Sequence, residues 1–389
     1  MCERVYRKNV ELVCYYMENV VVVLNYTSWV SNWIDKLHPY LRNVNLHIIH
    51  ISKLQKEYCE GLKKYNQYDV SYLSYSELRK LFQTLSPSKC VFFTFRSVLD
   101  LTIYKLCIDL KIRKLYLEHG LITNDTLHFR SNAIKTSPID SIKRQLMYIY
   151  KYMGYALKSP SFLKEMSELF QVYIKGKFDL LQFDHYFLLS QRSFVVFKRI
   201  FINVEENFTI VGYPIFTDDI QKNNIPIPNN KEGIIYVHQP LIADGVASIS
   251  YEDEKNFILE LSNVLSPKYG KFTLLLHPRS NLDEYKSRFK DSDIKIIQSP
   301  GNYKIFIDKK LVIGHYSTAL LYGLYFNIPT ILIDYPTMKA NDLFKSVFQS
   351  FESAQDALKA EIHVNKEAKL YVLGKHNTYQ YIANYIEQF

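Results

Sequence analysis

Two short apolar stretches decide the expected fold, and polar side chains follow each of them directly. The first, Phe272–Arg279, reads FTLLLHPR, and the second, Lys310–Ala319, reads KLVIGHYSTA. A short continuous apolar run that ends at Gly, Pro or polar residues is typical of a buried strand in a parallel sheet. Ligands of open parallel sheets bind beyond the carboxyl ends of the strands. We therefore expect His277, Ser317 and Thr318 to border one pocket, and hydroxyls at a helix start suit a phosphate.

The second stretch belongs to a longer apolar segment that has the length of a transmembrane helix. Leu311–Ile333 contains no Asp, Glu, Lys or Arg, and such a run is long enough to cross a bilayer. Gly314, Ser317 and Pro329 interrupt it at intervals that fit a strand, a helix and a second strand. We predict a buried β-α-β unit rather than a membrane span.

The same alternation of strand and helix patterns occurs throughout the chain, which predicts an α/β protein with parallel sheets. A polar, proline-bearing tract, Asp218–Gly233, divides the pattern and indicates a domain boundary. We expect an N-terminal Rossmann-like domain over residues 1–217 and a C-terminal one over residues 233–389. Two such domains that face each other across a cleft resemble the GT-B glycosyltransferases. The strands are expected at Asn19–Leu24, Val44–Ile51, Cys90–Phe95, Lys114–Glu118, Tyr186–Ser190, Phe208–Pro214, Ile234–His238, Phe272–Leu276, Ile294–Ile297, Leu311–Gly314 and Thr330–Asp334.

Composition and charge restrict the class of protein. Hydrophobic residues make up 48% of the 389 residues and charged residues 22%, which excludes a disordered or fibrous chain. Lys and Arg number 48 against 39 Asp and Glu, a formal charge of +9 that favours an anionic partner such as a nucleotide, nucleic acid or acidic lipid. The five cysteines have no metal-binding spacing, and the N-terminus has no signal-peptide pattern. We expect a reduced, cytoplasmic protein.

Residues 141–178 have a helical pattern with seven basic residues, two glutamates and five tyrosines. Such a surface suits peripheral contact with an anionic membrane, here the inner face of the cytoplasmic membrane. A solvated helix pair that packs its tyrosines on the domain explains the pattern equally well. Nucleic acid is not an expected partner, because recognition-helix, zinc and RNA-binding aromatic motifs are all missing from the sequence.

Four motifs follow one another at predicted strand ends. In chain order they are Glu118-His119-Gly120, His238–Gly245 (HQPLIADG), His277-Pro278-Arg279 and Ser317-Thr318. The set resembles the bacterial lipooligosaccharide sialyltransferase and polysialyltransferase families. Those families share an acidic-acidic-glycine motif, a His-Pro motif and a Ser/Thr pair. The resemblance covers mainly residues 233–334.

This resemblance implies an enzyme with the GT-B fold: an inverting, metal-independent glycosyltransferase that needs no cofactor. It would move sialic acid, or a related 2-keto sugar, from a CMP-activated donor to a glycan or glycolipid acceptor of a bacterial capsule or lipooligosaccharide. Residues 1–217 would then be the acceptor side and residues 233–389 the nucleotide-sugar side. Carried over, Glu118 is the general base and His277 serves the leaving phosphate. Ser317 and Thr318 would hold that phosphate.

Some residues leave alternatives open. Asp244 is an alternative base, because the middle residue of the first motif is a histidine and not an acid. Arg279 would meet the donor's phosphate or the sugar's carboxylate. His238 and Gln239 would line the nucleotide or close a turn before Pro240. The motifs also resemble those of capsule Kdo transferases and CDP-glycerol glycerophosphotransferases. A non-catalytic, basic protein that binds nucleic acid or membrane is a more distant alternative.

Overall fold

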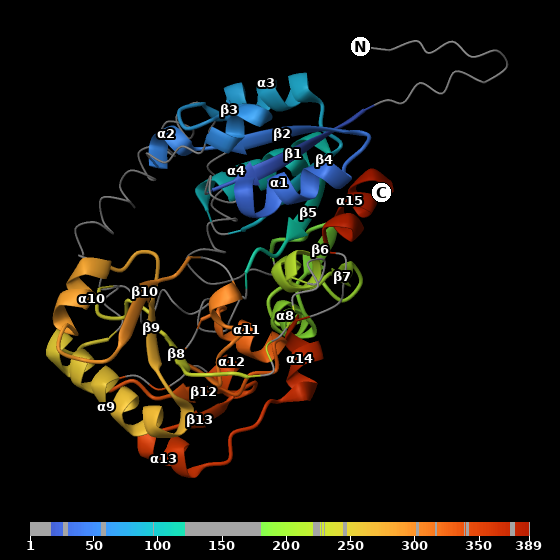
Figure 1. Ribbon diagram of the computed structural model, residues 1–389. Coiled ribbons are helices and arrows are strands. Elements are labelled where there is room, and N and C mark those ends of the chain that lie inside the picture. The colour runs from blue at the N-terminus through green and yellow to red at the C-terminus, as the bar shows by residue number, and fades with distance from the viewer. Residues whose placement is uncertain are drawn as a thin grey trace.

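The computed structural model in Figure 1 forms two parallel sheets. The first has seven strands in the order β3-β2-β1-β4-β5-β6-β7, and the second has six in the order β10-β9-β8-β11-β12-β13. All strand pairs within them are parallel, which confirms the predicted α/β class with two sheets. The structure describes residues 17–25, 30–55, 60–95, 97–120, 180–220, 226, 228, 230–243, 247–300, 303–315, 317–337, 339, 342–373 and 378–388.

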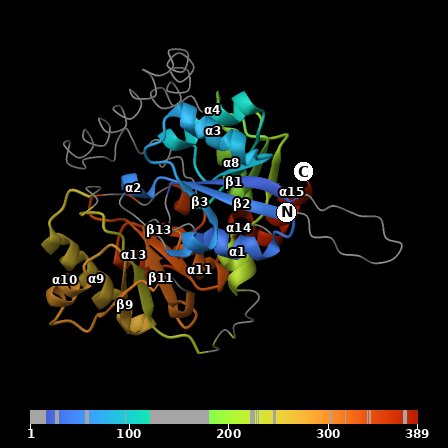
Figure 2. The ribbon, with the colours of Figure 1, turned by 90° about the horizontal axis from the view of Figure 1, so that it is seen from above.

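The central strands of the first sheet are buried on both faces, as their apolar sequences predict. In β1, Val20 and Val22 point into one core cluster, while Val21 and Val23 point into another. Seen from above, α3 and α4 cover one face and α1 and α14 lie toward the other (Figure 2). The strands are β1 (Glu18–Leu24), β2 (Val44–His50), β3 (Asn66–Asp69), β4 (Lys89–Phe92), β5 (Arg113–Leu117), β6 (His185–Leu188) and β7 (Phe208–Ile210). The helices and helical turns are η1 (Val30–Ile34), α1 (Asp35–Leu37), η2 (His38–Tyr40), α2 (Ser52–Gln55), η3 (Glu60–Lys64), α3 (Tyr75–Leu85), α4 (Val98–Leu110), α8 (Gln191–Lys198) and η5 (Ile215–Ile220).

The second sheet contains the long apolar segment as a buried β-α-β unit. This segment forms β11, α11 and β12, as predicted, and no helix among the described residues is long and apolar enough to span a membrane. A Cβ atom at Gly323 would lie 2.0 Å from the Thr330 hydroxyl, so this glycine allows α11 to pack closely on β12. The strands are β8 (Ile234–Val237), β9 (Phe272–Leu276), β10 (Lys295–Gln298), β11 (Leu311–Gly314), β12 (Thr330–Ile333) and β13 (Gln349–Phe351). The helices and helical turns that follow β8 in the chain are α9 (Tyr251–Tyr269), α10 (Leu282–Arg288), η7 (Tyr303–Ile305), α11 (Leu320–Tyr325), α12 (Asp342–Lys345), α13 (Ala354–Lys359), α14 (Lys366–Leu373) and α15 (Thr378–Gln388).

The C-terminal helix α15 packs on the first sheet, which the predicted unit 233–389 did not anticipate (Figure 1). The buried Lys89 ammonium donates to the Ile386 carbonyl at 2.7 Å, and the Tyr385 ring stacks on His185 at 4.1 Å. At the start of α15, the Thr378 hydroxyl donates to the Val211 carbonyl at 2.8 Å. The buried face of an amphipathic helix such as α15 does not indicate on which sheet the helix packs, so this arrangement was not visible in the sequence.

Each sheet has a topological switch point, where the chain connections run in opposite directions from two adjacent strands. The chain runs outward from β1 through β2 to β3 on one side and through β4 on the other, so the connections diverge between β1 and β4. The same divergence occurs between β8 and β11 in the second sheet. In doubly wound sheets the crevice at this point, beyond the carboxyl ends of the strands, is where ligands bind.

Candidate functional site

Three histidines lie at the carboxyl ends of neighbouring strands of the second sheet. His277 follows β9, His238 follows β8 and His315 follows β11, and these strands are adjacent in the order β9-β8-β11. Neighbouring strands lie about 4.8 Å apart, so the three strand ends span about 10 Å. The structure therefore brings His277 and the Ser317-Thr318 turn to one edge, with His238 between them.

The main chain fixes the protonation pattern of His277. Its half-buried ring accepts a hydrogen bond at Nδ1 from the Arg279 backbone N–H at 3.2 Å. A backbone N–H can only donate, so the neutral ring must carry its proton on Nε2. His277 is thereby prepared to donate a hydrogen bond from Nε2. The side chain of Arg279 is exposed at the same turn.

The Ser317-Thr318 turn leads into α11. Ser317 is half-buried and Thr318 is exposed. The Ser317 hydroxyl oxygen accepts a hydrogen bond from the Ala319 backbone N–H at 3.2 Å, and its carbonyl accepts one from Leu320 N–H at 3.0 Å. The serine therefore stabilises the turn through its oxygen, while its O–H proton stays available for donation.

His238 belongs to a buried polar network under this edge. The ring is 1% exposed, and its Nε2 lies 2.9 Å from Oε1 of Glu254, which is also 1% exposed. Burial alone would raise the pKa of Glu254, but hydrogen bonds from His238, Tyr335 and Tyr285 outweigh it and lower the pKa. Gln239, by contrast, is half-buried and accepts from Leu241 N–H through its carbonyl at 2.8 Å, so it closes a turn.

His315 supports the edge from within the core. Its Nε2 lies 2.6 Å from the Tyr236 hydroxyl, and burial lowers the pKa of His315 to about 4. The ring is therefore neutral and structural. Asp244, the alternative base, lies outside the described residues.

In the first sheet, the predicted base Glu118 is buried where a substrate hydroxyl cannot reach it. Its side chain is fully buried, with Oε2 accepting from Leu189 N–H at 2.7 Å and Oε1 from the Ser193 hydroxyl at 2.9 Å. A general base must reach the hydroxyl of its substrate. Glu118 instead stabilises the start of α8, where a negative charge is favourable.

The neighbouring His119, unlike Glu118, is partly exposed at this strand end. It is half-buried, and its Nδ1 lies 2.7 Å from the Phe93 carbonyl oxygen. A carbonyl can only accept, so the neutral ring carries its proton on Nδ1 and its lone pair on Nε2. The sequence contained this signal, because a histidine at a strand end is a titratable group in a site-forming position. In the acidic-acidic-glycine motif, however, an acid and not a histidine is expected at this position.

A second polar group of the first sheet was not predicted. Asn25 follows β1, and its amide Nδ2 donates to the Thr94 hydroxyl at 2.7 Å and to Asp100 Oδ1 at 2.8 Å. Asp100 is fully buried, and burial raises its pKa. Thr94 also donates to Asp100, at 2.5 Å. These three side chains lie at the switch point between β1 and β4, next to the carbonyl that holds His119.

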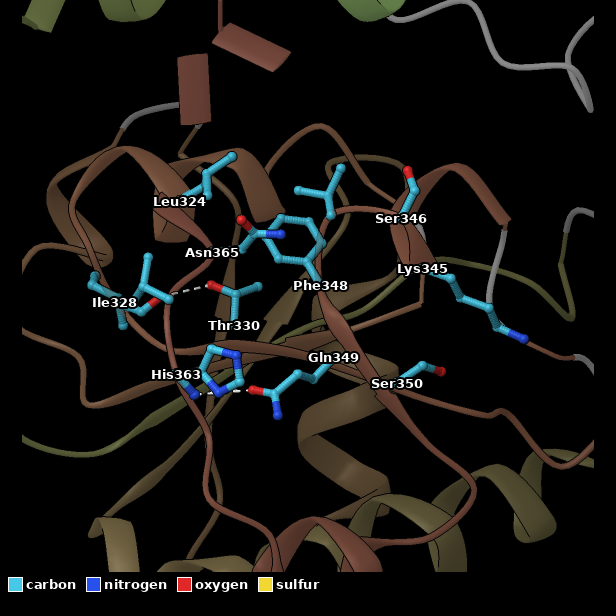
Figure 3. Close-up of a pocket in the computed structure, with 12 residues that line it drawn as sticks. Leu324, Ile328, Thr330, Lys345, Ser346, Phe348, Gln349, Ser350, His363 and Asn365 are labelled. Carbon is cyan, nitrogen blue, oxygen red and sulfur yellow. Dashed lines mark hydrogen bonds between the residues drawn. The ribbon is translucent and has the colours of Figure 1, made fainter. Parts of the chain in front are cut away.

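Two hollows lie beside the second sheet. One, of about 550 Å³, borders the carboxyl ends of β12 and β13 and includes Asp334, Tyr335 and Lys339. The other, of about 310 Å³, lies at the amino ends of the same strands, where Figure 3 shows Thr330, Gln349 and His363. The residues that line these hollows include none of the predicted site residues. Within the described ranges no group of three or more His, Cys, Asp or Glu side chains could hold a metal ion, and metal independence stays a prediction.

Comparison with known proteins defines the class of fold. No protein-family model matches the chain, and no curated protein matches it. Solved structures do match over nearly the full length, and with the two parallel sheets they define a GT-B fold.

Three of these structures show how far the similarity extends. UDP-GlcNAc 2-epimerase of Methanocaldococcus jannaschii has 14% identity over 95% of this chain and 100% of its own, with a TM-score of 0.50. Acinetobacter baumannii MurG has 8% identity over 96% and 100%, with a TM-score of 0.51. The glycotransferase of kitacinnamycin has 11% identity over 95% and 98%, also with a TM-score of 0.51. At these identities the similarity concerns the fold.

Proposed function

We propose that this protein is an inverting, metal-independent glycosyltransferase that transfers sialic acid, or a related 2-keto sugar, from a CMP-activated donor to a bacterial surface glycan. The observation that carries the proposal is a pair of histidines at the carboxyl ends of the two sheets. His119 has its lone pair on Nε2 and His277 has its proton there. One ring is therefore suited to accept a proton and the other to donate a hydrogen bond.

On the donor side, the bond between the sugar's anomeric carbon and the CMP phosphate oxygen breaks, and the electron pair moves to that oxygen. His277 Nε2–H donates to this oxygen as its negative charge develops. The hydroxyls of Ser317 and Thr318 hydrogen-bond the phosphate. Arg279, exposed at the same edge, binds the phosphate or the sugar's carboxylate.

On the acceptor side, His119 Nε2 removes the proton of the attacking hydroxyl, and the new glycosidic bond forms on the face opposite to the departing phosphate. We assign the base to His119 rather than Glu118, because both oxygens of Glu118 accept hydrogen bonds, from Leu189 N–H and the Ser193 hydroxyl, and its side chain is fully buried. The acceptor is a glycan or a glycolipid. The proposed contact with the inner face of the cytoplasmic membrane falls on residues 141–178, which lie outside the described residues.

A donor screen tests this proposal. CMP-sialic acid, CMP-Kdo and CDP-glycerol are each incubated with the protein in EDTA, and release of CMP, the leaving group of all three donors, is measured. We expect consumption of CMP-sialic acid, and His277→Ala should slow it by about 100-fold or more. His363→Ala, an exposed histidine at the opposite edge of the sheet, is the matched control and should keep full activity.

The other outcomes are equally informative. Consumption of CMP-Kdo or CDP-glycerol alone would replace the proposed donor by one of the two related alternatives. Full activity of His277→Ala, with unchanged folding by circular dichroism, would contradict the assignment of the site.

A further inference from the structure

His238 lies at the centre of the carboxyl edge of the second sheet. The proposed function assigns no contact with the donor to any atom of this residue. β8 lies between the strand that ends in His277 and the strand that leads to Ser317. A nucleotide whose phosphate is held by those two groups must pass beside the end of β8. His238 is therefore the residue that follows the strand in the middle of the proposed donor site, and its buried ring lies beneath this edge.

The network around Glu254 determines which nitrogen of His238 carries the proton. The buried carboxylate accepts from the Tyr335 hydroxyl at Oε1, at 2.8 Å, and from the Tyr285 hydroxyl at Oε2, at 2.9 Å. Arg288 adds positive charge, with Nη1 3.7 Å from Oε2. An ionised carboxylate has only acceptor atoms, so His238 Nε2, at 2.9 Å from Oε1, must donate.

The opposite nitrogen of the same ring is unsatisfied. Nδ1 of His238 is buried and has no hydrogen-bond partner among the described residues. In the neutral ring with its proton on Nε2, this atom is a hydrogen-bond acceptor. Leaving a buried acceptor without a donor destabilises a protein, so such an atom in a native structure requires an explanation.

We propose that Nδ1 of His238 accepts a hydrogen bond from an uncharged O–H or N–H group of the donor nucleotide, and that Glu254 is the positioning residue that fixes the required tautomer. This inference rests on the proposed nucleotide-sugar donor. Two groups of a cytidine nucleotide fit the chemistry: a ribose hydroxyl and the amino group of the base. Both are donors, whereas the phosphate oxygens are acceptors and would repel this lone pair. Because Nδ1 is buried in the structure, the proposal requires that donor binding exposes it.

Calorimetry with a matched pair of variants tests the proposal. His238→Gln keeps an N–H group for Glu254 but removes the Nδ1 acceptor, so we expect the fold to persist while CMP binds about tenfold more weakly. His185→Gln, at a buried histidine of the first sheet that bonds the Thr209 hydroxyl at 3.0 Å, is the control and should bind CMP as the unmodified protein does.

Two nucleotide analogues identify the partner group. 2′-Deoxy-CMP lacks one ribose hydroxyl, and UMP has an oxygen in place of the amino group. The unmodified protein should prefer CMP to one of these by about tenfold, and His238→Gln should lose that preference. A merely structural role of His238 would weaken all three ligands equally.

A measurement on the unmodified protein covers the case in which the variant fails to fold. Long-range ¹H–¹⁵N correlation spectra should show the His238 ring protonated on Nε2, and the Nδ1 resonance should shift when CMP is added. A ring protonated on Nδ1, or unchanged binding and discrimination in His238→Gln, would overturn the inference while leaving the proposed function intact. If the unmodified protein binds no CMP, both proposals fail.

Discussion

A histidine lies at the carboxyl edge of each sheet, but the two rings carry their proton on different nitrogen atoms. In the first sheet a carbonyl of the neighbouring strand end, Phe93, holds the proton of His119 on Nδ1. In the second sheet the backbone N–H of Arg279 donates to Nδ1 of His277 and leaves the proton on Nε2. The difference shows that the main chain, and not the residue type, decides whether such a histidine can act as a base or as a hydrogen-bond donor.

The switch points of the two sheets also correspond. The residue that follows the first strand of each sheet, Asn25 after β1 and His238 after β8, is held by a buried carboxylate from a helix, Asp100 of α4 or Glu254 of α9. In each case the atom on the other side of the held side chain is buried and unpartnered within the described part of the chain. The two buried carboxylates therefore orient the side chains of Asn25 and His238 and need not contact a substrate themselves.

The largest expected effect tests which residue is the base at the carboxyl edge of the first sheet. His119→Ala should lower the rate of transfer by about 10² to 10⁴-fold, because it removes the lone pair that we assign as the base. Its neighbour provides the matched comparison: Glu118→Gln should keep activity within a few-fold. That change should lower the free energy of unfolding by about 1–3 kcal/mol, since it disturbs the buried contacts to Leu189 and Ser193.

Transfer rates and urea unfolding of both variants distinguish the two residues. If Glu118→Gln is inactive with unchanged stability while His119→Ala stays active, the carboxylate is the base after all. The comparison between the two edges would then no longer hold.

The next effect concerns stability as a function of pH. Burial lowers the pKa of His185 in the first sheet and of His315 in the second to about 4, from an ordinary value of 6.5. Between pH 6.5 and 4 the unfolded chain binds protons that the folded protein does not, so stability falls as the pH falls through this window. Each histidine should account for on the order of 2 kcal/mol.

Urea unfolding at pH 7 and pH 4.5 measures this loss for both sheets. His185→Gln should abolish the part of the loss in unfolding free energy that comes from the first sheet. His315→Gln should abolish the part that comes from the second. A free energy of unfolding that is the same at both pH values would show that the two rings are not buried in their neutral form.

The sequence predicted the sheets because their strands are short, apolar runs that end at polar or glycine residues. Strands such as β1 and β11 are buried on both faces, and burial is visible in composition. The edge strands β3 (NQYD) and β13 (QSF) are polar and half-exposed or exposed, so no apolar pattern marks them. Between β1 and β2 the described chain forms three short helical elements, η1, α1 and η2, whose boundaries no Gly or Pro pattern marks except Pro39.

The sequence predicted at which strand ends the candidate site residues lie. It did not predict the orientation and hydrogen bonds of their side chains. His277 and Ser317 could be placed because ligands gather at strand ends, and the structure brings both to one edge. The exchange of roles between Glu118 and His119 depends on the hydrogen bonds of Glu118 with Leu189 and Ser193, which are 71 and 75 residues away in sequence. The unpartnered nitrogen of His238 likewise depends on Glu254, and spacing alone does not fix hydrogen-bond geometry.

The smallest expected effect concerns single hydroxyls at the two edges. Ser317→Ala should weaken CMP binding about three- to tenfold, because one neutral hydrogen bond to the phosphate is lost. Thr94→Val, which removes a hydroxyl from the first edge, should leave CMP affinity unchanged, since that edge is proposed to bind the acceptor. Calorimetry at constant pH and salt compares the two. Equal weakening by both variants would mean that the nucleotide lies between the edges, and the division into donor and acceptor edges would have to be abandoned.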